Sequence, residues 1–381
     1  MIYDYAIIGC GFAGLYAAYV LEKRGYHTIA FEASKNLGGR AIEKEINNYK
    51  VKIGGGIVDF DNLELIKLVQ SFGIKLNKMK QRIIDDYMNY DYDINESINL
   101  IKEKYFEINQ CLNMTVDEFL DHYFGLEFKN MYYKFSEFND FKDQDINDYI
   151  LRYKIEDNLR GEYECYSFSY SELADKMKRN IIYEKIISIE KNNGQIILNK
   201  NYKTKNVINC MTISEANKLY NYSFLNEIGS VPFCRIYTYH KEKLNIPNGI
   251  IILDNECKKM IKMNDFLVMS VYCDSENALY WKDKIENDEI LETLKSKLNF
   301  LPPIEEYLLS YWFDGIHYFK PNIKNQDALN MRKYWLLDNM NPEPGIYFAG
   351  EYFSEKGGYV EGAISSVNFL MDNFIFIKSV K

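Results

Sequence analysis

Three glycines and one acid near the start of the chain have the types and the spacing of a dinucleotide-binding site. Gly9, Gly11 and Gly14 follow directly on an apolar run, and a second apolar run ends at Glu32. In such a turn the first glycine permits a tight bend, the second lets the backbone approach a pyrophosphate, and the third lets the next helix pack close to the strand. The helix N-terminus offers N–H groups to the phosphates, and Glu32 can accept hydrogen bonds from ribose hydroxyls and disfavours a 2′-phosphate.

The segments around this turn must position it as strand, helix and strand. We expect strands over residues 5–8 and 28–31, and between them a helix over 15–24 that ends at Gly25. A glycine turn in an ordinary α/β domain is the alternative interpretation. The strand–helix context and the distance to the acid favour nucleotide binding.

Further glycines continue the pattern of close backbone approach. Gly38 and Gly39 precede Arg40, which suits a loop that passes phosphates and adds a fixed positive charge. Gly54–Gly56 follow a strand expected over 49–53. The backbone can approach a flat ligand closely there, because glycine has no side chain.

Composition limits the classes of protein that the chain can represent. Its 381 residues favour two domains, or one domain with a large insertion. A net charge of −9 argues against nucleic acid or an anionic membrane as the main partner, and no run of about twenty apolar residues predicts a membrane span. The seven cysteines form no CxxC pair and no signal peptide is recognisable, so we expect reduced thiols, a cytoplasmic location and no targeting segment. No two of the four histidines have metal-ligand spacing, so no metal is expected.

The two ends of the chain together resemble the flavin-containing amine oxidase family, to which monoamine, polyamine and L-amino-acid oxidases belong. Near the start, the resemblance consists of the glycine turn, the acid, the sequence LGGR at 37–40 and a glycine pair after a short strand. Near the end, GIYFAGE at 345–351 and GYVEGA at 358–363 closely resemble the family's C-terminal FAD motif. Motifs so far apart in the chain must meet around one cofactor.

The resemblance implies FAD as the cofactor and names the residues that would bind it. Ile316 falls where monoamine oxidases carry the cysteine that bonds to the flavin, so noncovalent FAD is expected. A helix that begins at 359–360 would direct its N–H groups at the flavin pyrimidine. The residues expected to bind the cofactor are Gly9, Gly11, Phe12, Ala13, Gly14, Glu32, Ala33, Gly39, Arg40, Gly54, Gly55, Gly56, Ile186, Gly350, Glu351, Tyr359 and Val360.

By the same resemblance, three residues are candidates for chemistry beside the flavin. Arg235 matches the position where the family carries a lysine that holds a water near the flavin N5, and arginine keeps the charge but cannot lose a proton. Tyr359 and His317 match the two positions that flank the substrate path, and a histidine there could titrate near neutrality and act as a base or donor. The structural alternatives are a strand arginine in an ion pair, a core tyrosine and a histidine satisfied by backbone.

The expected fold class is a two-lobed α/β fold with a Rossmann-type FAD domain and a mixed sheet-and-helix substrate domain. The resemblance implies an FAD-binding domain from 1–78, 165–215 and 335–381, and a substrate domain from 79–164 and 216–334. Helical spacing and strand-like runs predict the elements inside them. They are helices over 63–72, 94–106, 115–124, 145–152, 171–178 and 288–298, a hairpin of 181–189 with 195–198, and strands over 206–210, 234–239, 250–253, 267–272 and 306–313.

The activity that the resemblance implies is an FAD-dependent oxidase of an amine or related C–N substrate, with molecular oxygen as acceptor. The same fold also carries desaturases, protoporphyrinogen-type oxidases and sugar-nucleotide mutases, and the GYVEGA helix start favours the oxidases over the mutases. A flavin-binding protein without turnover is a further alternative, because Arg235 and His317 depart from the family's pattern. The sequence leaves the substrate and the oligomeric state open.

Overall fold

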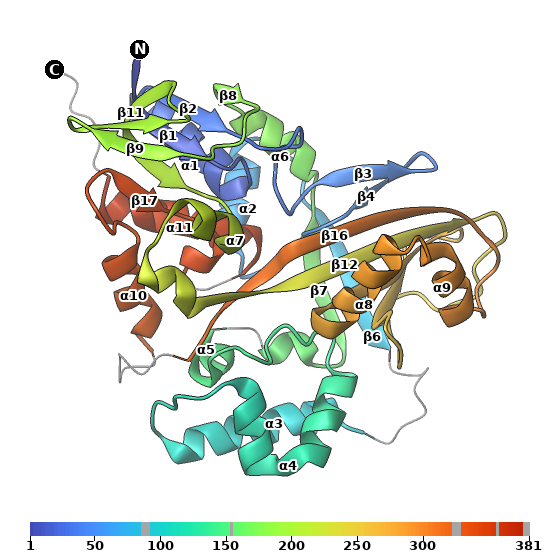
Figure 1. Cartoon of the computed structure of the whole chain (residues 1–381). Coiled ribbons are helices and arrows are strands. Elements are labelled where there is room, and N and C mark those ends of the chain that lie inside the picture. The colour runs from blue at the N-terminus through green and yellow to red at the C-terminus, as the bar shows by residue number, and fades with distance from the viewer. Residues whose placement is uncertain (85–91, 153–154, 322–328, 356–357, 376–381) are drawn as a thin grey trace.

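The computed structural model describes residues 1–84, 92–152, 155–321, 329–355 and 358–375. It has two large sheets and a separate group of helices. Figure 1 shows the first sheet at one end of the molecule, the long strands β12 and β16 running away from it, and the helices α3 and α4 at the opposite end.

The first sheet collects strands from the start, the middle and the end of the chain. Its order is β8-β2-β1-β11-β10-β9, with β17 paired to β11. Parallel pairing joins β1 to both β2 and β11, which is the arrangement of a βαβ unit with a crossover helix. Its strands are β1 (Ile2–Ile8), β2 (Thr28–Phe31), β8 (Ile181–Ile182), β9 (Ile189–Asn192), β10 (Gln195–Leu198), β11 (Tyr202–Asn209) and β17 (Ile346–Phe348).

The second sheet has the order β16-β12-β15-β14-β13-β6-β7-β5. The antiparallel pair β12–β16 is its longest, and it extends from the side of the first sheet across the molecule (Figure 1). A small hairpin of β3 (Glu43–Ile46) and β4 (Tyr49–Lys52) lies beside it. The strands of the second sheet are β5 (Val58–Asp59), β6 (Asn77–Ile84), β7 (Glu162–Ser167), β12 (Ile228–His240), β13 (Ile250–Ile252), β14 (Lys259–Lys262), β15 (Leu267–Asp274) and β16 (Ile304–Phe319).

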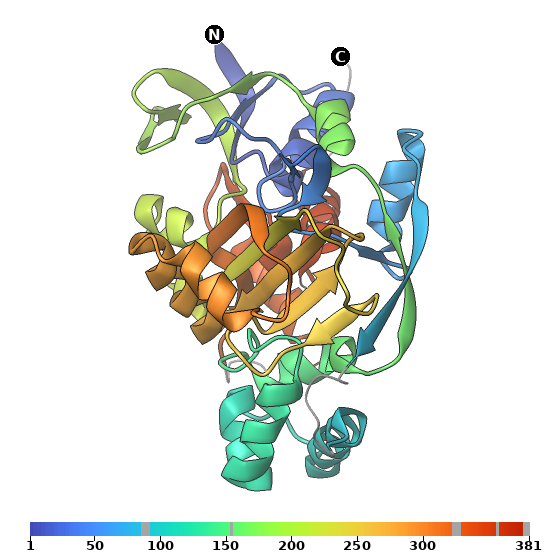
Figure 2. The same cartoon turned by 90° about the vertical axis from the view of Figure 1, so that its right-hand side faces the viewer.

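The helices fall into three groups by what they cover. Those near the first sheet are α1 (Phe12–Lys23), α2 (Leu63–Ser71), α6 (Tyr170–Met177), α7 (Ile213–Leu219), α10 (Met331–Asn339) and α11 (Tyr359–Asn373). On one face of the second sheet lie α8 (Ser275–Glu286) and α9 (Ile290–Lys297), drawn in orange in Figure 2. The separate group is α3 (Ile94–Ile108), α4 (Val116–Phe135) and α5 (Ile146–Leu151).

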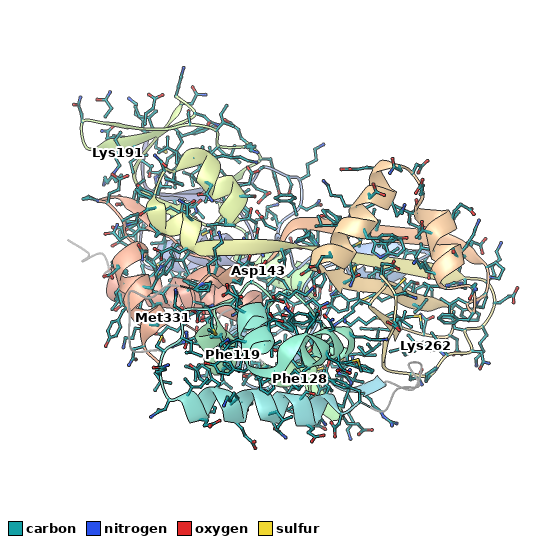
Figure 3. All side chains as sticks on the ribbon, turned by 60° about the horizontal axis from the view of Figure 1, so that its bottom comes forward. Phe119, Phe128, Asp143, Lys191, Lys262 and Met331 are labelled. Atoms are coloured by element: carbon teal, nitrogen blue, oxygen red, sulfur yellow. The ribbon has the colours of Figure 1, made fainter. Side chains whose placement is uncertain are left out.

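Local sequence signals explain why the separate helical group forms. The side chain of Asp93 accepts hydrogen bonds from the first turn of α3, and Thr115 and Glu118 form a capping box at the start of α4. Phe119 of α4 lies in the core of this group, and Phe128 of the same helix is partly buried and packs against it (Figure 3). The structure confirms the expected helices there, and α4 continues beyond the predicted end through a kink at Gly125, whose φ is +81°.

One predicted strand was wrong. The stretch 181–189 is not one strand, because β8 ends at Ile182 and β9 begins at Ile189. The region 79–160, expected to be mostly helical, holds α3, α4 and α5, and it also contains most of β6, which pairs antiparallel with β7 along six residues of each strand. The hairpin turn at Asn193 and Gly194, with φ of +50° and +75°, has the conformation that the sequence predicts.

The division into FAD and substrate domains remains a proposal, although every strand of the first sheet lies within the ranges expected for the former. Among the described residues, no helix combines the length and apolar character that crossing a bilayer requires.

Candidate functional site

A cavity of about 1900 Å³ lies where the glycine turn, the two sheets and the N-terminus of α11 meet. Ligand pockets usually measure about 300–1,000 Å³, so this one has room for a dinucleotide and a second molecule. Every residue that the sequence nominated lines it except Gly14. The structure therefore brings together segments from 9–13, 32–40, 54–56, 350–351 and 358–363.

The three glycines of the turn have different surroundings. Gly9 has a φ of +95°, and a Cβ on it would lie 2.9 Å from the carbonyl oxygen of Cys210. A Cβ on Gly14 would lie 1.9 Å from the carbonyl oxygen of Gly9, so only glycine lets α1 pack against β1. A Cβ on Gly11 would meet nothing closer than the Cα of Gly39, at 3.8 Å. The space beside Gly11 is thus open to a ligand, and the other two glycines serve the fold.

The N-terminus of α1 is prepared for an anion. Its N-cap, Gly11, supplies no side-chain cap, and the first turn carries no acid. The first N–H groups of a helix have no partner within the helix and favour negative charge. Glu32 accepts hydrogen bonds from the backbone N–H of Cys10 (2.9 Å) and of Ser34 (2.8 Å), which fixes its carboxylate beside the turn.

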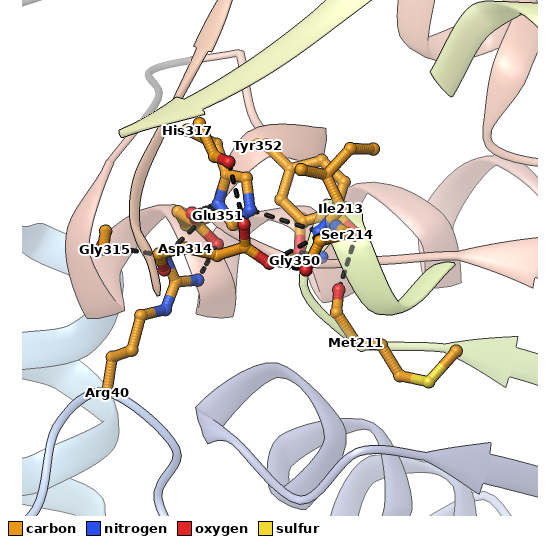
Figure 4. A network of polar contacts seen from close by, with 12 residues as sticks. Arg40, Met211, Ile213, Ser214, Asp314, Gly315, His317, Gly350, Glu351 and Tyr352 are labelled. Atoms are coloured by element: carbon orange, nitrogen blue, oxygen red, sulfur yellow. Dashed lines mark hydrogen bonds and ion pairs between the residues drawn. The ribbon is translucent and has the colours of Figure 1, made fainter. Parts of the chain in front are cut away.

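A buried charge network lies where the C-terminal motif meets the loop after β2. Figure 4 shows Arg40, Glu351 and His317 pointing toward one another. Arg40 forms an ion pair with Glu351 (2.6 Å) and donates to the carbonyl oxygen of Gly315 (3.0 Å). Burial raises the pKa of Glu351, but Arg40 and His317 outweigh burial and hold that pKa far below its usual value. Arg40 thus lines the cavity with a fixed positive charge that Glu351 balances, and its expected contact with the cofactor phosphates stays a prediction.

His317 is held by partners on both ring nitrogens. The backbone N–H of Ile213 donates to Nε2 (3.2 Å), so Nδ1 carries the proton that the carboxylate of Glu351 accepts. The ring packs against Tyr352 with its side chain fully buried. The ring of His317 is therefore buried and does not lie free beside a substrate path, which corrects that part of the expectation. Both nitrogens are occupied, and the residue positions Glu351.

Arg235 on β12 is buried, with 3% of its surface exposed. Its Nη1 donates to the carbonyl oxygens of Lys52 (2.8 Å) and Gly54, and its guanidinium lies 4.1 Å from the centre of the Tyr272 ring. It is thus not a surface arginine. It lines the cavity and holds the glycine segment 54–56 from the side of the second sheet.

The helix α11 begins where the C-terminal motif predicts, at Tyr359. Tyr359 is 47% exposed, lines the cavity and has a φ of +57°, so it is not the core tyrosine of the alternative interpretation. Val360 also lines the cavity, and one of its methyl groups would lie 3.9 Å from a Cβ on Gly55. The expected role of Tyr359 beside a substrate stays a prediction.

Sequence reasoning missed several charged and aromatic residues of the cavity wall, among them Lys52, Lys259, Glu137 and Tyr272. Lys52 donates to the carbonyl oxygen of Gly56 (2.8 Å), and burial lowers its pKa to about 8. Lys259 forms a buried ion pair with Glu137 (2.9 Å), and its ammonium lies over the ring of Tyr272. No motif spacing indicates these residues, because their partners come from distant segments.

Comparisons with known proteins agree with this architecture. A family model described as an NAD(P)-binding Rossmann-like domain matches residues 7–71. Pseudooxynicotine dehydrogenase of Pseudomonas sp is 33% identical over 76 residues, which are 20% of this chain and 15% of that protein. Putrescine oxidase of Kocuria rosea is 35% identical over 72 residues, 19% of this chain and 15% of that protein. These sequence matches span about a seventh of each relative's length.

Solved structures match over nearly the whole chain. Putrescine oxidase bound to putrescine superposes with a TM-score of 0.71 and 15% identity, over 98% of this chain and 99% of that one. Cyclohexylamine oxidase from Brevibacterium oxydans IH-35A gives 0.71 and 13%, over 97% and 98%. A protein from Exiguobacterium sp. 255-15 described as a protoporphyrinogen oxidase gives 0.69 and 13%, over 97% and 98%. At these identities the likeness establishes the fold, which is the two-lobed α/β fold expected from the sequence.

Proposed function

We propose that this protein is an FAD-dependent oxidoreductase that oxidises a C–N bond of an amine-type substrate, with molecular oxygen as acceptor. One observation carries the proposal: one cavity joins the uncapped N-terminus of α1 to residues of the second sheet. The end of the cavity at the α1 N-terminus suits a pyrophosphate, because the helix offers unpaired N–H groups there. The end at the second sheet suits a small molecule. The amine oxidases named above share this fold from end to end.

The residues that line the end at the α1 N-terminus fit FAD. The open space beside Gly11 and the first turn of α1 would receive the pyrophosphate, and Glu32 would accept hydrogen bonds from the ribose. The segment 54–56 and the start of α11 would face the flavin ring, with Val360 and Gly55 in near contact. The residue at the position expected for a covalent flavin link is Ile316, which has no nucleophile, so binding would be noncovalent.

When bound, the flavin would supply the redox chemistry, removing a hydride equivalent from the carbon beside nitrogen. The protein's share is to orient the substrate and to exclude water. Arg235 fixes the glycine segment through two carbonyl oxygens and keeps a positive charge in a buried wall. The pair Arg40–Glu351, positioned by His317, holds the C-terminal motif against the loop after β2.

Two other functions use the same architecture. A protoporphyrinogen-type oxidase or a desaturase would use the flavin on a C–C bond, and the Exiguobacterium protein shares the fold equally well. A flavin-binding protein without turnover would bind FAD at the α1 N-terminus and would need no path for a substrate at the second sheet. The amine proposal is preferred because the relatives matched in sequence include amine-oxidising enzymes.

Anaerobic mixing with amines tests the proposal. Purified protein should be yellow, and acid should release free FAD into the supernatant. An amine substrate should bleach the flavin without oxygen, and air should restore the colour with release of hydrogen peroxide. Bleaching by a tetrapyrrole or polyene but by no amine would support the C–C alternatives. Reduction by dithionite alone would support the protein without turnover.

A further inference from the structure

Lys52, the last residue of β4, lines the cavity. Its Nζ donates to the carbonyl oxygen of Gly56 (2.8 Å) and to Ser167 Oγ (2.6 Å), and both of these residues line the cavity as well. Gly56 belongs to the segment 54–56, which the proposed function puts beside the flavin ring. The amino group of Lys52 is therefore held at the part of the wall where an oxidation would occur.

The two contacts of Lys52 suit the neutral form of its amino group as well as the charged form. The ammonium has three N–H groups and no lone pair, whereas the neutral amine has two N–H groups and one lone pair. Gly56 and Ser167 can accept both N–H groups of the neutral form. The lone pair is then left to accept a proton from a molecule in the cavity.

The surroundings of Lys52 favour the loss of its proton. Burial lowers the pKa of Lys52 to about 8, and the positive charge of Arg235 on β12 acts in the same direction. Glu43 on β3 and Cys165 on β7 act in the opposite direction and do not outweigh burial. The ring of Tyr170, 5.1 Å from Nζ, covers the amino group from α6. Lys52 can therefore exchange a proton near neutral pH.

The basic side chains near the segment 54–56 and the C-terminal motif are poorer proton acceptors. Arg235 keeps its proton at any pH that the protein meets. His317 already has a partner on each ring nitrogen. Arg40 is an arginine in an ion pair with Glu351, so it also keeps its proton.

Carboxylates of the cavity wall can attract a cation but are weak bases. With a carboxyl pKa of about 4 and an ammonium pKa of about 10, the proton transfer is unfavourable by roughly a millionfold. For an acceptor with a pKa of about 8 the factor is only roughly a few hundred. The carboxylates concerned are those of Asp59, Asp61, Glu137, Glu162 and Glu164.

An amine substrate needs such an acceptor. It enters as an ammonium ion, which has no lone pair on nitrogen. Loss of a hydride equivalent from the neighbouring carbon requires that lone pair, because nitrogen shares it as the C=N bond forms. One proton must therefore leave the substrate nitrogen first, and a group in the cavity must accept it.

We propose that Lys52 is the general base that takes this proton from the bound substrate. The N–H bond of the ammonium breaks, its electron pair stays on the substrate nitrogen, and the proton forms a bond to Nζ of Lys52. The products are a neutral amine and a charged Lys52, which returns the proton to water after the product leaves. This role rests on the proposed function, because it requires an amine substrate. It leaves to Arg235 the holding of the segment 54–56.

The titration of Lys52 can be measured without turnover. In flavin-loaded protein that contains lysine with carbon-13 at the ε position, the NMR signal missing from Lys52→Arg belongs to Lys52. Its midpoint should lie near pH 8, whereas an unperturbed lysine titrates near 10.4. A midpoint near 10.4 would overturn the proposal.

Anaerobic reduction of the flavin by a primary amine, followed against pH, tests the proton transfer itself. The wild-type rate should rise with pH and level off above about pH 8, where Lys52 is neutral. Lys52→Met should be about a hundredfold slower at neutral pH. Its rate should continue to rise toward the pKa of the free amine, because the substrate then arrives neutral. Loss of a merely structural contact would slow reduction equally at every pH.

Lys52→Arg separates the proton from the charge. Arginine can donate to the same oxygens but cannot lose a proton, so this variant should be about as slow as Lys52→Met near neutrality. Lys44→Met is the control, because Lys44 is exposed on β3 of the same hairpin, opposite Val51, and should leave the pH profile unchanged. Flavin absorbance after gel filtration checks that each variant retains the cofactor.

A Lys52→Arg protein that is reduced as fast as wild type, with the same pH profile, would overturn the proposal while the proposed function stands. Failure of the proposed function has a different signature. In that case no amine would reduce the wild-type flavin even where the free amine is neutral, and Lys52 would have no ammonium to act on.

Discussion

Gly11 and Gly14 belong to the same turn but serve different purposes. Gly11 has open space beside it for a ligand, whereas Gly14 is needed for the fold. A side chain on Gly11 has room in the protein alone, and its φ of −67° suits any residue. We therefore expect Gly11→Val to fold with a melting temperature close to that of the wild-type apoprotein but to lose FAD, because the side chain fills the space beside the α1 N-terminus.

Gly14→Ala is the matched control for that prediction. Its Cβ would lie 1.9 Å from a carbonyl oxygen, so it should destabilise the fold itself, with or without cofactor. Flavin absorbance after gel filtration and thermal unfolding of the apoproteins measure the two effects. A Gly11→Val protein that retains full FAD would refute the assignment of this turn to the pyrophosphate.

The ionisation of Glu351 should make the free energy of unfolding depend on pH. Its folded pKa is depressed by Arg40 and His317 against the effect of burial. The stabilisation from Glu351 is therefore complete above its unfolded pKa of about 4.3 and is lost as the pH falls below that value toward the folded pKa. Glu351→Gln should cost about 1–3 kcal/mol at neutral pH, because it leaves the partly buried Arg40 without its counter-charge.

The difference in free energy of unfolding between wild type and Glu351→Gln should shrink below about pH 4, where the wild type loses this contribution. Urea titrations from neutral to acid pH measure it. Glu164→Gln is the control, since Glu164 pairs with Lys78 at the surface and should change the curves little. A difference that is constant across the pH range would contradict the network.

At the scale of elements, a side chain of α11 caps the N-terminus of α2. The carboxylate of Glu361, in the first turn of α11, accepts hydrogen bonds from the backbone N–H of Leu65 (2.8 Å) and of Glu64 (3.2 Å). The N-cap of α2, Asn62, provides no side-chain cap of its own. The acid of the C-terminal motif therefore caps a helix from the start of the chain.

Glu361→Ala should lower the free energy of unfolding by about 1–2 kcal/mol, the usual cost of losing a helix cap. Chemical denaturation of the flavin-loaded protein measures it. Glu96→Ala, in the first turn of α3, is the comparison, because the cap of α3 comes from Asp93 instead. Equal losses in the two variants would show that Glu361 acts only as an ordinary first-turn acid.

The elements that the sequence predicted are those whose pattern is local. The βαβ unit was predictable because β1, α1 and β2 each bury a continuous apolar set around fixed glycines. The strand β6 was missed because its side chains are mostly exposed and polar, with Ile83 buried, and because it is held by backbone pairing to β7. β12 and β16 run longer than predicted, since each continues through partly polar residues paired with the other.

The same distinction applies to the site. The glycines and the C-terminal motif follow from sequence because the chemistry of a dinucleotide fixes their spacing. The partners of Arg40, His317 and Lys52 could not be predicted, because each comes from a segment brought near only by the fold.

At the scale of the whole molecule, the cavity takes residues from both sheets, so one ligand should stabilise both. Gly11 lies at the N-terminus of α1 beside the first sheet, and Trp312 lies on β16 of the second and donates to the carbonyl oxygen of Ile53 (3.2 Å). A ligand that binds only the folded state adds about 2.7 kcal/mol of stability at a hundredfold excess over its Kd.

We therefore expect removal of FAD to lower the stability of the entire chain, and readdition of FAD to restore it. Unfolding followed by tryptophan fluorescence, to which Trp312 contributes, and by circular dichroism should shift together as FAD is added, because the cofactor bridges the two sheets. Riboflavin, which lacks the pyrophosphate and adenosine, should stabilise far less, because it cannot use the N-terminus of α1. NAD fills the turn but offers no flavin ring to the segment 54–56, so it should also fall short of FAD. Stabilisation by NAD equal to that by FAD would contradict the assignment of a flavin to this cavity.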